Sequence, residues 1–144
     1  MRILVTGVKG QLGFDVCREL VRRGIDHWGT DIDDVDITDA TATRKSIEAY
    51  CPDAVIHCAA WTNVDGAEDE ANIGKVEEIN AGGTRNIAAV CKELNCKMMY
   101  ISTDYVFDGQ ATEPWPPDCK DYHPLNVYGQ TKLEGELAVS GLLE

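Results

Sequence analysis

The chain has 144 residues, enough for one domain with a hydrophobic core, and we expect no second domain. Its 25 acidic and 13 basic side chains give a net charge of −12, which argues against nucleic acid or an anionic membrane surface as a partner. No apolar run reaches the length of a membrane span, and Met1 leads into a predicted strand without a leader, so we expect a cytoplasmic protein.

The amino end of the chain predicts a phosphate-binding turn. An apolar strand at Arg2–Thr6 is joined to a helix, expected from Gln11 to about residue 23, by three regularly spaced glycines: Gly7, Gly10 and Gly13. The first glycine permits a tight turn, the second lets backbone approach a diphosphate closely, and the third lets the helix pack against the strand. The N–H groups and dipole at the helix start would face the anion. An ordinary strand-to-helix turn is the alternative interpretation.

The second predicted strand, residues 25–30, ends at Asp31, about twenty residues beyond the glycines. Dinucleotide-binding folds place a carboxylate on the adenosine ribose at this position. The acidic run 31–34 would also repel a 2′-phosphate, and no arginine lies nearby to offset it, so we favour NADH over NADPH. Asp36 and Ile37 are expected to flank the adenine. The alternative interpretation is an acidic turn at the surface.

The rest of the chain alternates helices and strands. The expected elements are a helix over 40–50, a strand over 54–58, a long helix from 65 to about 94, a strand over 97–101 and a final helix from about 126. Thr38 or Asp39 should cap the first of these helices, and the acidic residues 65–70 should cover the first turn of the long one. This order predicts a Rossmann-type α/β fold, a doubly wound parallel sheet with strand order 3-2-1-4. His57, inside the third strand, is interpreted as a core histidine rather than a ligand.

Six cysteines could indicate a disulfide framework or a zinc site, but they form no Cys-x-x-Cys pair, and several fall in predicted core segments. Buried, reduced thiols are the favoured interpretation. The cysteines are Cys17, Cys51, Cys58, Cys91, Cys96 and Cys119.

Two later segments carry groups suited to chemistry beside a dinucleotide. The third strand opens into small residues that let a cofactor lie against backbone; the segment comprises Ala59, Ala60, Trp61 and Thr62. The long segment 105–125, rich in Pro and Asp, is expected to be functional or mobile.

Tyr128 and Lys132 are four residues apart, so they share one face of the final helix. A tyrosine can give a proton to a carbonyl that is being reduced if its pKa, ordinarily about 10, is lowered. The Lys132 ammonium would favour the phenolate and could hydrogen-bond the nicotinamide ribose. A hydroxyl at the end of the fourth strand, from Ser102 or Thr103, would orient the substrate oxygen. By itself the Tyr128–Lys132 pair could also be an exposed amphipathic pattern. The glycine turn, the Ser-Thr end of the fourth strand and the order of these segments along the chain favour an active site instead.

Four segments together resemble the extended short-chain dehydrogenase/reductases, and within them most closely the dTDP-4-dehydrorhamnose reductase family. The resemblance runs from end to end, whereas sugar-nucleotide epimerases and dehydratases share the Tyr and Lys but differ after the fourth strand. The segments are TGVKGQLG at 6–13, CAAWTNVD at 58–65, STDYVFDG at 102–109 and PLNVYGQTKLEGE at 124–136.

The resemblance implies reduction of the 4-keto group of dTDP-4-dehydro-L-rhamnose to dTDP-L-rhamnose by a reduced nicotinamide. It makes Tyr128 the proton donor, with Lys132 supporting it and binding ribose, and Thr103 with Asp104 holding the keto sugar. The implied cofactor contacts are Gly10, Gln11 and Leu12 at the diphosphate, Asp31 at the adenosine ribose, Asp36 and Ile37 at the adenine, and Ala60, Trp61 and Thr62 along the middle.

Members of this family continue well past residue 144 into further strands and a substrate-binding region. We therefore expect residues 1–144 to form a partial dinucleotide-binding domain that stops after the Tyr-x-x-x-Lys helix. Some members bind Mg²⁺ between subunits, and Asp15 falls where one such carboxylate lies; the other ligands come from sequence absent here, so no metal is predicted. A homodimer is compatible with the resemblance. The alternatives are a non-catalytic nucleotide-binding subunit, like the β subunit of methionine adenosyltransferase, or another nucleotide-sugar reductase or epimerase.

Overall fold

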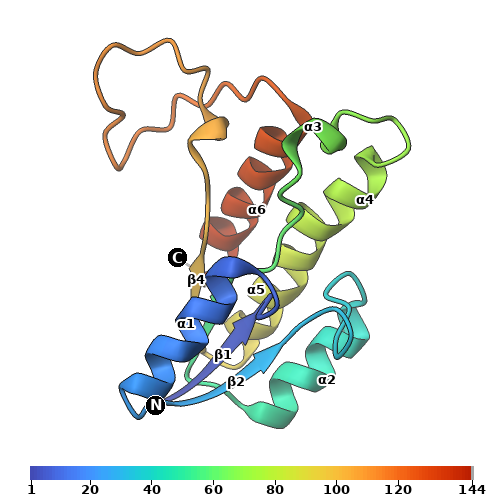
Figure 1. Cartoon of the computed structure of the whole chain (residues 1–144), viewed down its shortest axis with the longest axis vertical. Coiled ribbons are helices and arrows are strands. Elements are labelled where there is room, and N and C mark those ends of the chain that lie inside the picture. The colour runs from blue at the N-terminus through green and yellow to red at the C-terminus, as the bar shows by residue number, and fades with distance from the viewer. Residues whose placement is uncertain (144) are drawn as a thin grey trace.

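The computed structural model describes residues 1–143, in which a four-stranded parallel sheet is covered by helices on both faces (Figure 1). The strands are β1 (Arg2–Thr6), β2 (Asp26–Thr30), β3 (Ala54–His57) and β4 (Lys97–Tyr100). The helices are α1 (Gln11–Arg22), α2 (Ala40–Tyr50), α3 (Val64–Ala67), α4 (Ile73–Glu77), the π-helical η1 (Glu78–Gly83), α5 (Thr84–Glu93), the 3₁₀ turn η2 (Asp104–Val106) and α6 (Val127–Leu143). The predicted Rossmann-type fold is confirmed.

Alternate residues of the central strand β1 point to two separate cores, as the period of a strand requires. Ile3 and Val5 pack with Leu20 of α1 on one face. Leu4 packs on the other face in a cluster contributed mainly by α2, β3 and α5. A sheet buried on both faces in this way is typical of doubly wound α/β proteins.

The order of the strands is β2-β1-β3-β4, so the predicted order 3-2-1-4 is wrong. The third strand pairs with β1 rather than with β2. The sequence of β2, DHWGT, alternates between exposed and covered positions, as suits an edge strand, whereas β3 is apolar enough to lie between two neighbours. β2 lies on one side of β1 and β3 on the other, so the connections that follow β1 and β3 lead to opposite sides of the sheet. This arrangement creates a crevice at the carboxyl ends of β1 and β3.

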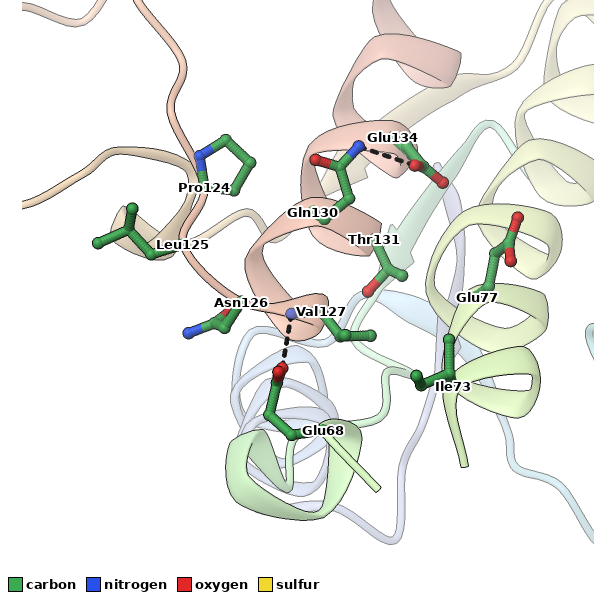
Figure 2. A pocket seen from close by; sticks show the side chains of 10 residues that line it. All are labelled: Glu68, Ile73, Glu77, Pro124, Leu125, Asn126, Val127, Gln130, Thr131 and Glu134. Carbon is green, nitrogen blue, oxygen red and sulfur yellow. Dashed lines mark hydrogen bonds between the residues drawn. The ribbon is translucent and has the colours of Figure 1, made fainter. Parts of the chain in front are cut away.

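The predicted long helix over 65–94 is interrupted, because its first part forms α3 and a turn before α4 begins. The Asn63 side chain caps α3 by accepting a hydrogen bond from the Gly66 N–H at 3.0 Å. Only Asp65 of the acidic run lies in a first helical turn. Glu68 acts elsewhere: its carboxylate accepts a hydrogen bond from the Val127 N–H at 2.7 Å, so it caps the start of α6 (Figure 2).

The paired glycines of the predicted long helix lie in η1 rather than in regular α-helix. A Cβ atom on Gly83 would come within 2.6 Å of Ile37, which lies between β2 and α2. Gly83 therefore permits close packing of η1 against this segment.

Asp39 caps α2, and its Oδ1 accepts hydrogen bonds from the Thr41 N–H at 2.8 Å and the Ala42 N–H at 3.0 Å. Asp39→Ala should therefore lower the free energy of unfolding by about 1 kcal/mol, measured by urea titration. Asp39→Asn keeps an acceptor at the cap and should lose much less. Equal stability of the Asp39→Ala and unaltered proteins would contradict this assignment.

The loop between η2 and α6 is irregular, as predicted, and it is held by an aromatic stack. Phe107 lies between Trp115, at 4.6 Å between ring centroids, and Tyr122, at 5.7 Å. The Tyr122 hydroxyl donates to Glu136 of α6 at 2.9 Å. These contacts attach the loop to the helix that carries Tyr128 and Lys132.

Within residues 1–143, no helix combines the length and the apolar character needed to cross a bilayer. All six cysteines carry free thiols. Cys91 and Cys96 are buried as predicted, whereas Cys51, which ends α2 in the left-handed conformation at φ +51°, is exposed.

Candidate active site

A cleft of about 1010 Å³ opens at the carboxyl ends of the strands. It includes the last residues of β1, β2 and β3 and the residues that follow β4. Every residue predicted to contact a cofactor lines it: Gly7, Gly10, Gln11, Leu12, Gly13, Asp31, Asp36, Ile37, Ala59, Ala60, Trp61, Thr62, Tyr128 and Lys132. Residues from both ends of the chain thus meet around one space, in the crevice where open α/β sheets bind ligands.

The glycine turn brings backbone to the surface of this cleft. Gly7 has φ +71°, and a Cβ atom there would lie 2.6 Å from the Ala59 nitrogen, so a side chain would separate β1 from the loop after β3. A Cβ atom on Gly13 would lie 2.8 Å from the Gly7 carbonyl carbon. Gly10 precedes α1, and no side chain caps the first-turn N–H groups of this helix. This arrangement suits a diphosphate, which can accept hydrogen bonds from those groups.

Asp31 is held at the end of β2 by the glycine turn. Its Oδ2 accepts a hydrogen bond from the Lys9 N–H, and its Oδ1 accepts one from the Ile32 N–H, each at 2.8 Å. The fixed carboxylate therefore borders the cleft next to the turn. The Lys9 ammonium forms an ion pair with Asp33. This positive charge partly offsets the acidic run 31–34 and so weakens the repulsion expected for a 2′-phosphate.

His57 is a core histidine, as predicted, and is 1% exposed. The Ala59 N–H donates to the Thr6 hydroxyl at 3.2 Å, and that hydroxyl lies 2.7 Å from His57 Nδ1. On the other side, His57 Nε2 lies 3.1 Å from the Thr84 hydroxyl, which donates to the Asn80 carbonyl at 2.6 Å. These directions fit a neutral imidazole with its proton on Nε2. Burial lowers the pKa of His57 to about 3, with a smaller effect from the Lys132 charge.

Asn80 is a site-supporting residue that the sequence analysis did not single out. It is 1% exposed, and its side-chain oxygen accepts from the Trp61 N–H at 2.8 Å. Its side-chain nitrogen donates to the Thr131 hydroxyl at 3.2 Å. Asn80 therefore ties the loop after β3 to α6. The signal available in the sequence was the glycine pair that follows it, Gly82 and Gly83, because these glycines lie in the same π-helical turn.

Tyr128 lies in the first turn of α6, beside the Thr103 side chain. Burial raises the pKa of Tyr128, and the neighbouring Thr103 side chain opposes this shift. Lys132 is not among the groups that shift the pKa of Tyr128 in this structure, so its effect on that pKa stays a prediction. The Lys132 ammonium lies instead over the Tyr100 ring, with its Nζ 4.1 Å from the ring centroid. Burial lowers the pKa of Lys132 to about 8.

The residues predicted to hold substrate lie beside the cleft rather than in its lining. The Thr103 hydroxyl donates to the Asp104 carboxylate at 3.2 Å and accepts from the Tyr105 N–H at 3.2 Å. Ser102, the alternative hydroxyl, does line the cleft and donates to Glu136 at 2.7 Å. The structure thus brings Thr103 next to Tyr128 and places Ser102 at the cleft wall.

Three lining residues that the sequence analysis missed come from α4 and η1: Lys75, Glu78 and Ile79. Lys75 Nζ lies 5.9 Å from the centre of a Trp61 ring, so it adds positive charge on that side of the cleft. Their i, i+3, i+4 spacing is that of one helix face, but nothing in the spacing indicates that this face borders a cleft.

A second, shallower hollow of about 460 Å³ lies between α3, α4 and the start of α6 (Figure 2). None of the predicted site residues lines it. Among the described residues, no group of three or more His, Cys, Asp or Glu side chains is arranged to hold a metal ion. Asp15, the residue considered for Mg²⁺, lies 3.3 Å from Arg18 on α1.

A family model described as "RmlD substrate binding domain" matches residues 1–144. A dTDP-4-keto-6-deoxy-D-glucose reductase from Streptomyces niveus is 40% identical over 144 residues, which are 99% of this chain and 48% of the relative. The crystal structure of a dTDP-4-dehydrorhamnose reductase from Clostridium acetobutylicum superimposes with a TM-score of 0.92 at 41% identity, covering 99% of this chain and 50% of that one.

The dTDP-4-dehydrorhamnose reductase from Bacillus anthracis, solved in complex with NADP, also superimposes with a TM-score of 0.92, at 38% identity over 98% of this chain and 49% of that one. This chain spans about half the length of the relatives it matches. The family model covers it from end to end, and the chain therefore belongs to the RmlD substrate binding domain family.

Proposed function

We propose that the cleft binds a reduced nicotinamide dinucleotide, and that the chain is the partial cofactor-binding domain of an enzyme that reduces the 4-keto group of dTDP-4-dehydro-L-rhamnose to dTDP-L-rhamnose. The observation that carries the proposal is the convergence of every predicted cofactor residue on one cleft. The names of the relatives support the substrate class, and the NADP complex of the Bacillus anthracis relative supports a nicotinamide cofactor.

The residues of the cleft fit such a cofactor. The open N-terminus of α1 beside Gly7 and Gly10 would take the diphosphate, and the fixed carboxylate of Asp31 would accept hydrogen bonds from the adenosine ribose. Bound there, a reduced nicotinamide supplies a hydride. Tyr128 would donate a proton to the substrate oxygen, and the Lys132 ammonium would donate a hydrogen bond to the nicotinamide ribose.

The expected substrate contact is the hydroxyl of Thr103, with Asp104 beside it. The Thr103 side chain lies beside Tyr128, so one substrate oxygen could accept hydrogen bonds from both hydroxyls. The neighbouring Thr103 side chain also opposes the rise in the pKa of Tyr128 that burial causes.

The direct test is to mix the protein with NADH and dTDP-4-dehydrorhamnose and follow the absorbance of the reduced nicotinamide. We expect the absorbance to fall with a form of the chain extended to the length of its relatives. No turnover by that form with this or other keto sugars, while NADH still binds, would contradict the reductase and favour a nucleotide-binding regulatory subunit. Turnover of a different nucleotide sugar alone would favour another reductase of the same class.

We further propose a preference for NADH over NADPH, supported by the position of Asp31. Asp31→Asn should weaken NADH binding by about 10-fold to 100-fold, because a hydrogen bond to a charged group contributes roughly 1.5–3 kcal/mol, and it should narrow the difference in affinity between NADH and NADPH. Fluorescence titration of both cofactors measures this. Asp15→Asn, which removes the same charge from the exposed face of α1, is the matched control. Tighter binding of NADPH than of NADH by the unaltered protein would contradict the preference.

The same proposal includes a cytoplasmic protein that binds no nucleic acid and forms homodimers. The net charge of −12 supports the absence of nucleic-acid binding, since phosphate would be repelled. Sedimentation of the protein tests the dimer, and a monomer at micromolar concentration would contradict it. Mg²⁺ is not part of the proposal.

A further inference from the structure

The Lys132 side chain is buried without a carboxylate partner. It is 4% exposed, and within residues 1–143 no Asp or Glu oxygen lies within ion-pair distance of its Nζ. A buried ammonium without a counter-ion is costly and tends to lose its proton. The face of Tyr100, 4.1 Å below the ammonium, is the group that compensates it.

Other contacts fix the Tyr100 ring in this position. Its hydroxyl donates to the Lys132 carbonyl oxygen at 3.0 Å, so the same tyrosine contacts both the backbone and the ammonium of one residue. A Cβ atom on Gly135 would lie 2.9 Å from Tyr100 Cζ, which means that α6 accommodates the ring only because residue 135 is glycine. The His57 ring stacks against Tyr100 with centroids 6.0 Å apart and an angle of 29° between the planes.

The other titratable groups around the ammonium do not replace this contact. From β3 come His57, neutral in its hydrogen-bond network, and the thiol of Cys58, whose pKa is raised by burial. From α6 comes Glu136, whose two oxygens accept hydrogen bonds from the hydroxyls of Ser102 and Tyr122. Glu136 therefore acts on Lys132 through space rather than as a direct partner.

We propose that Tyr100 is a positioning residue that seats the Lys132 ammonium: its ring face keeps the group charged and its hydroxyl fixes the helix turn from which the side chain projects into the cleft. Tyr100 itself does not line the cleft. The inference deepens the proposed function and rests on it for the role of Lys132 toward the cofactor. The contact between the Lys132 ammonium and the Tyr100 ring can be tested without an activity measurement, because it affects the pKa of Lys132.

Graded fluorination tests this contact with little change of shape. Phenylalanine at position 100 keeps the ring face, and replacing it with mono-, di- and trifluorinated phenylalanine weakens the negative potential of that face in steps. The protein is produced with ¹³C-labelled lysine, and the Lys132 side-chain signal is assigned with Lys132→Arg and titrated by NMR. We expect the Lys132 pKa to stay near 8 with phenylalanine and to fall by roughly 0.5–1 pH unit across the series.

Tyr50→Leu is the matched control, because Tyr50 packs on Trp28 and its hydroxyl has no partner within residues 1–143. It should leave the Lys132 titration unchanged. A constant Lys132 pKa across the fluorinated series would overturn the proposal. If the pKa falls in steps while NADH affinity at pH 8 stays constant, the contact with Tyr100 is confirmed and the cofactor role of Lys132 is refuted; a parallel loss of affinity supports both.

Discussion

Tyr128→Phe should reduce turnover of the keto sugar by about 100-fold to 10,000-fold, the range expected when a general acid is removed. The reason is that Tyr128 lines the cleft and has the Thr103 side chain beside it, so its hydroxyl is the candidate proton donor. Binding of NADH should change little, since phenylalanine keeps the ring. Stopped-flow turnover and fluorescence titration, made with the form extended to the length of the relatives, separate the two effects.

Tyr105→Phe is the control for this experiment. Its ring contacts that of Tyr128 edge-on, with centroids 5.6 Å apart, but it does not line the cleft. It should keep most of the activity. Turnover by Tyr128→Phe at the rate of the unaltered protein would refute the assignment of the proton donor.

The second large effect is a loss of stability in acid caused by His57. Its pKa is lowered to about 3 in the folded chain, against 6.5 for the ordinary value, so the unfolded chain binds a proton first as the pH falls. The contribution of the neutral histidine to stability is thus complete above pH 6.5 and is lost progressively towards pH 3. The free energy of unfolding should fall by about 4 kcal/mol over this range. Urea unfolding at a series of pH values measures it.

His57→Asn removes the titrating group while keeping a side chain that can hydrogen-bond Thr6 or Thr84. We expect this variant to be less stable at pH 7 but to lose much less stability between pH 6.5 and 4. His123→Asn, which makes the same replacement at an exposed histidine in the loop before α6, provides the control. The same pH dependence with and without His57 would show that another group is responsible.

The local signals in the sequence predicted the local structure well. The expected helix over 40–50 is α2 to the residue, with Asp39 as its cap, because an N-cap and a periodic apolar pattern act within a few residues of each other. The glycine turn is likewise encoded by adjacent residues. Gly7 has the positive φ and the close contact with Ala59 that its place in the motif requires.

Features set by distant contacts were not predictable in the same way. The strand order depends on which strands can be covered on both sides, and this is decided by contacts between segments that lie far apart in the sequence. The role of Asn80 depends on Trp61 and Thr131, which meet it only in the folded chain. Similarly, the spacing of Tyr128 and Lys132 placed them on one helix face but could not show that Tyr100 contacts the ammonium.

The central claim is that one dinucleotide reaches from the glycine turn to Tyr128. A crystal structure of the protein with NADH tests it most directly. We predict that the diphosphate lies at the N-terminus of α1 and that the nicotinamide ring packs beside the Tyr128 hydroxyl, leaving a space about 3–3.5 Å from both in which a carbonyl could react. A nicotinamide ring turned out of the cleft, away from Tyr128 and Lys132, would contradict it.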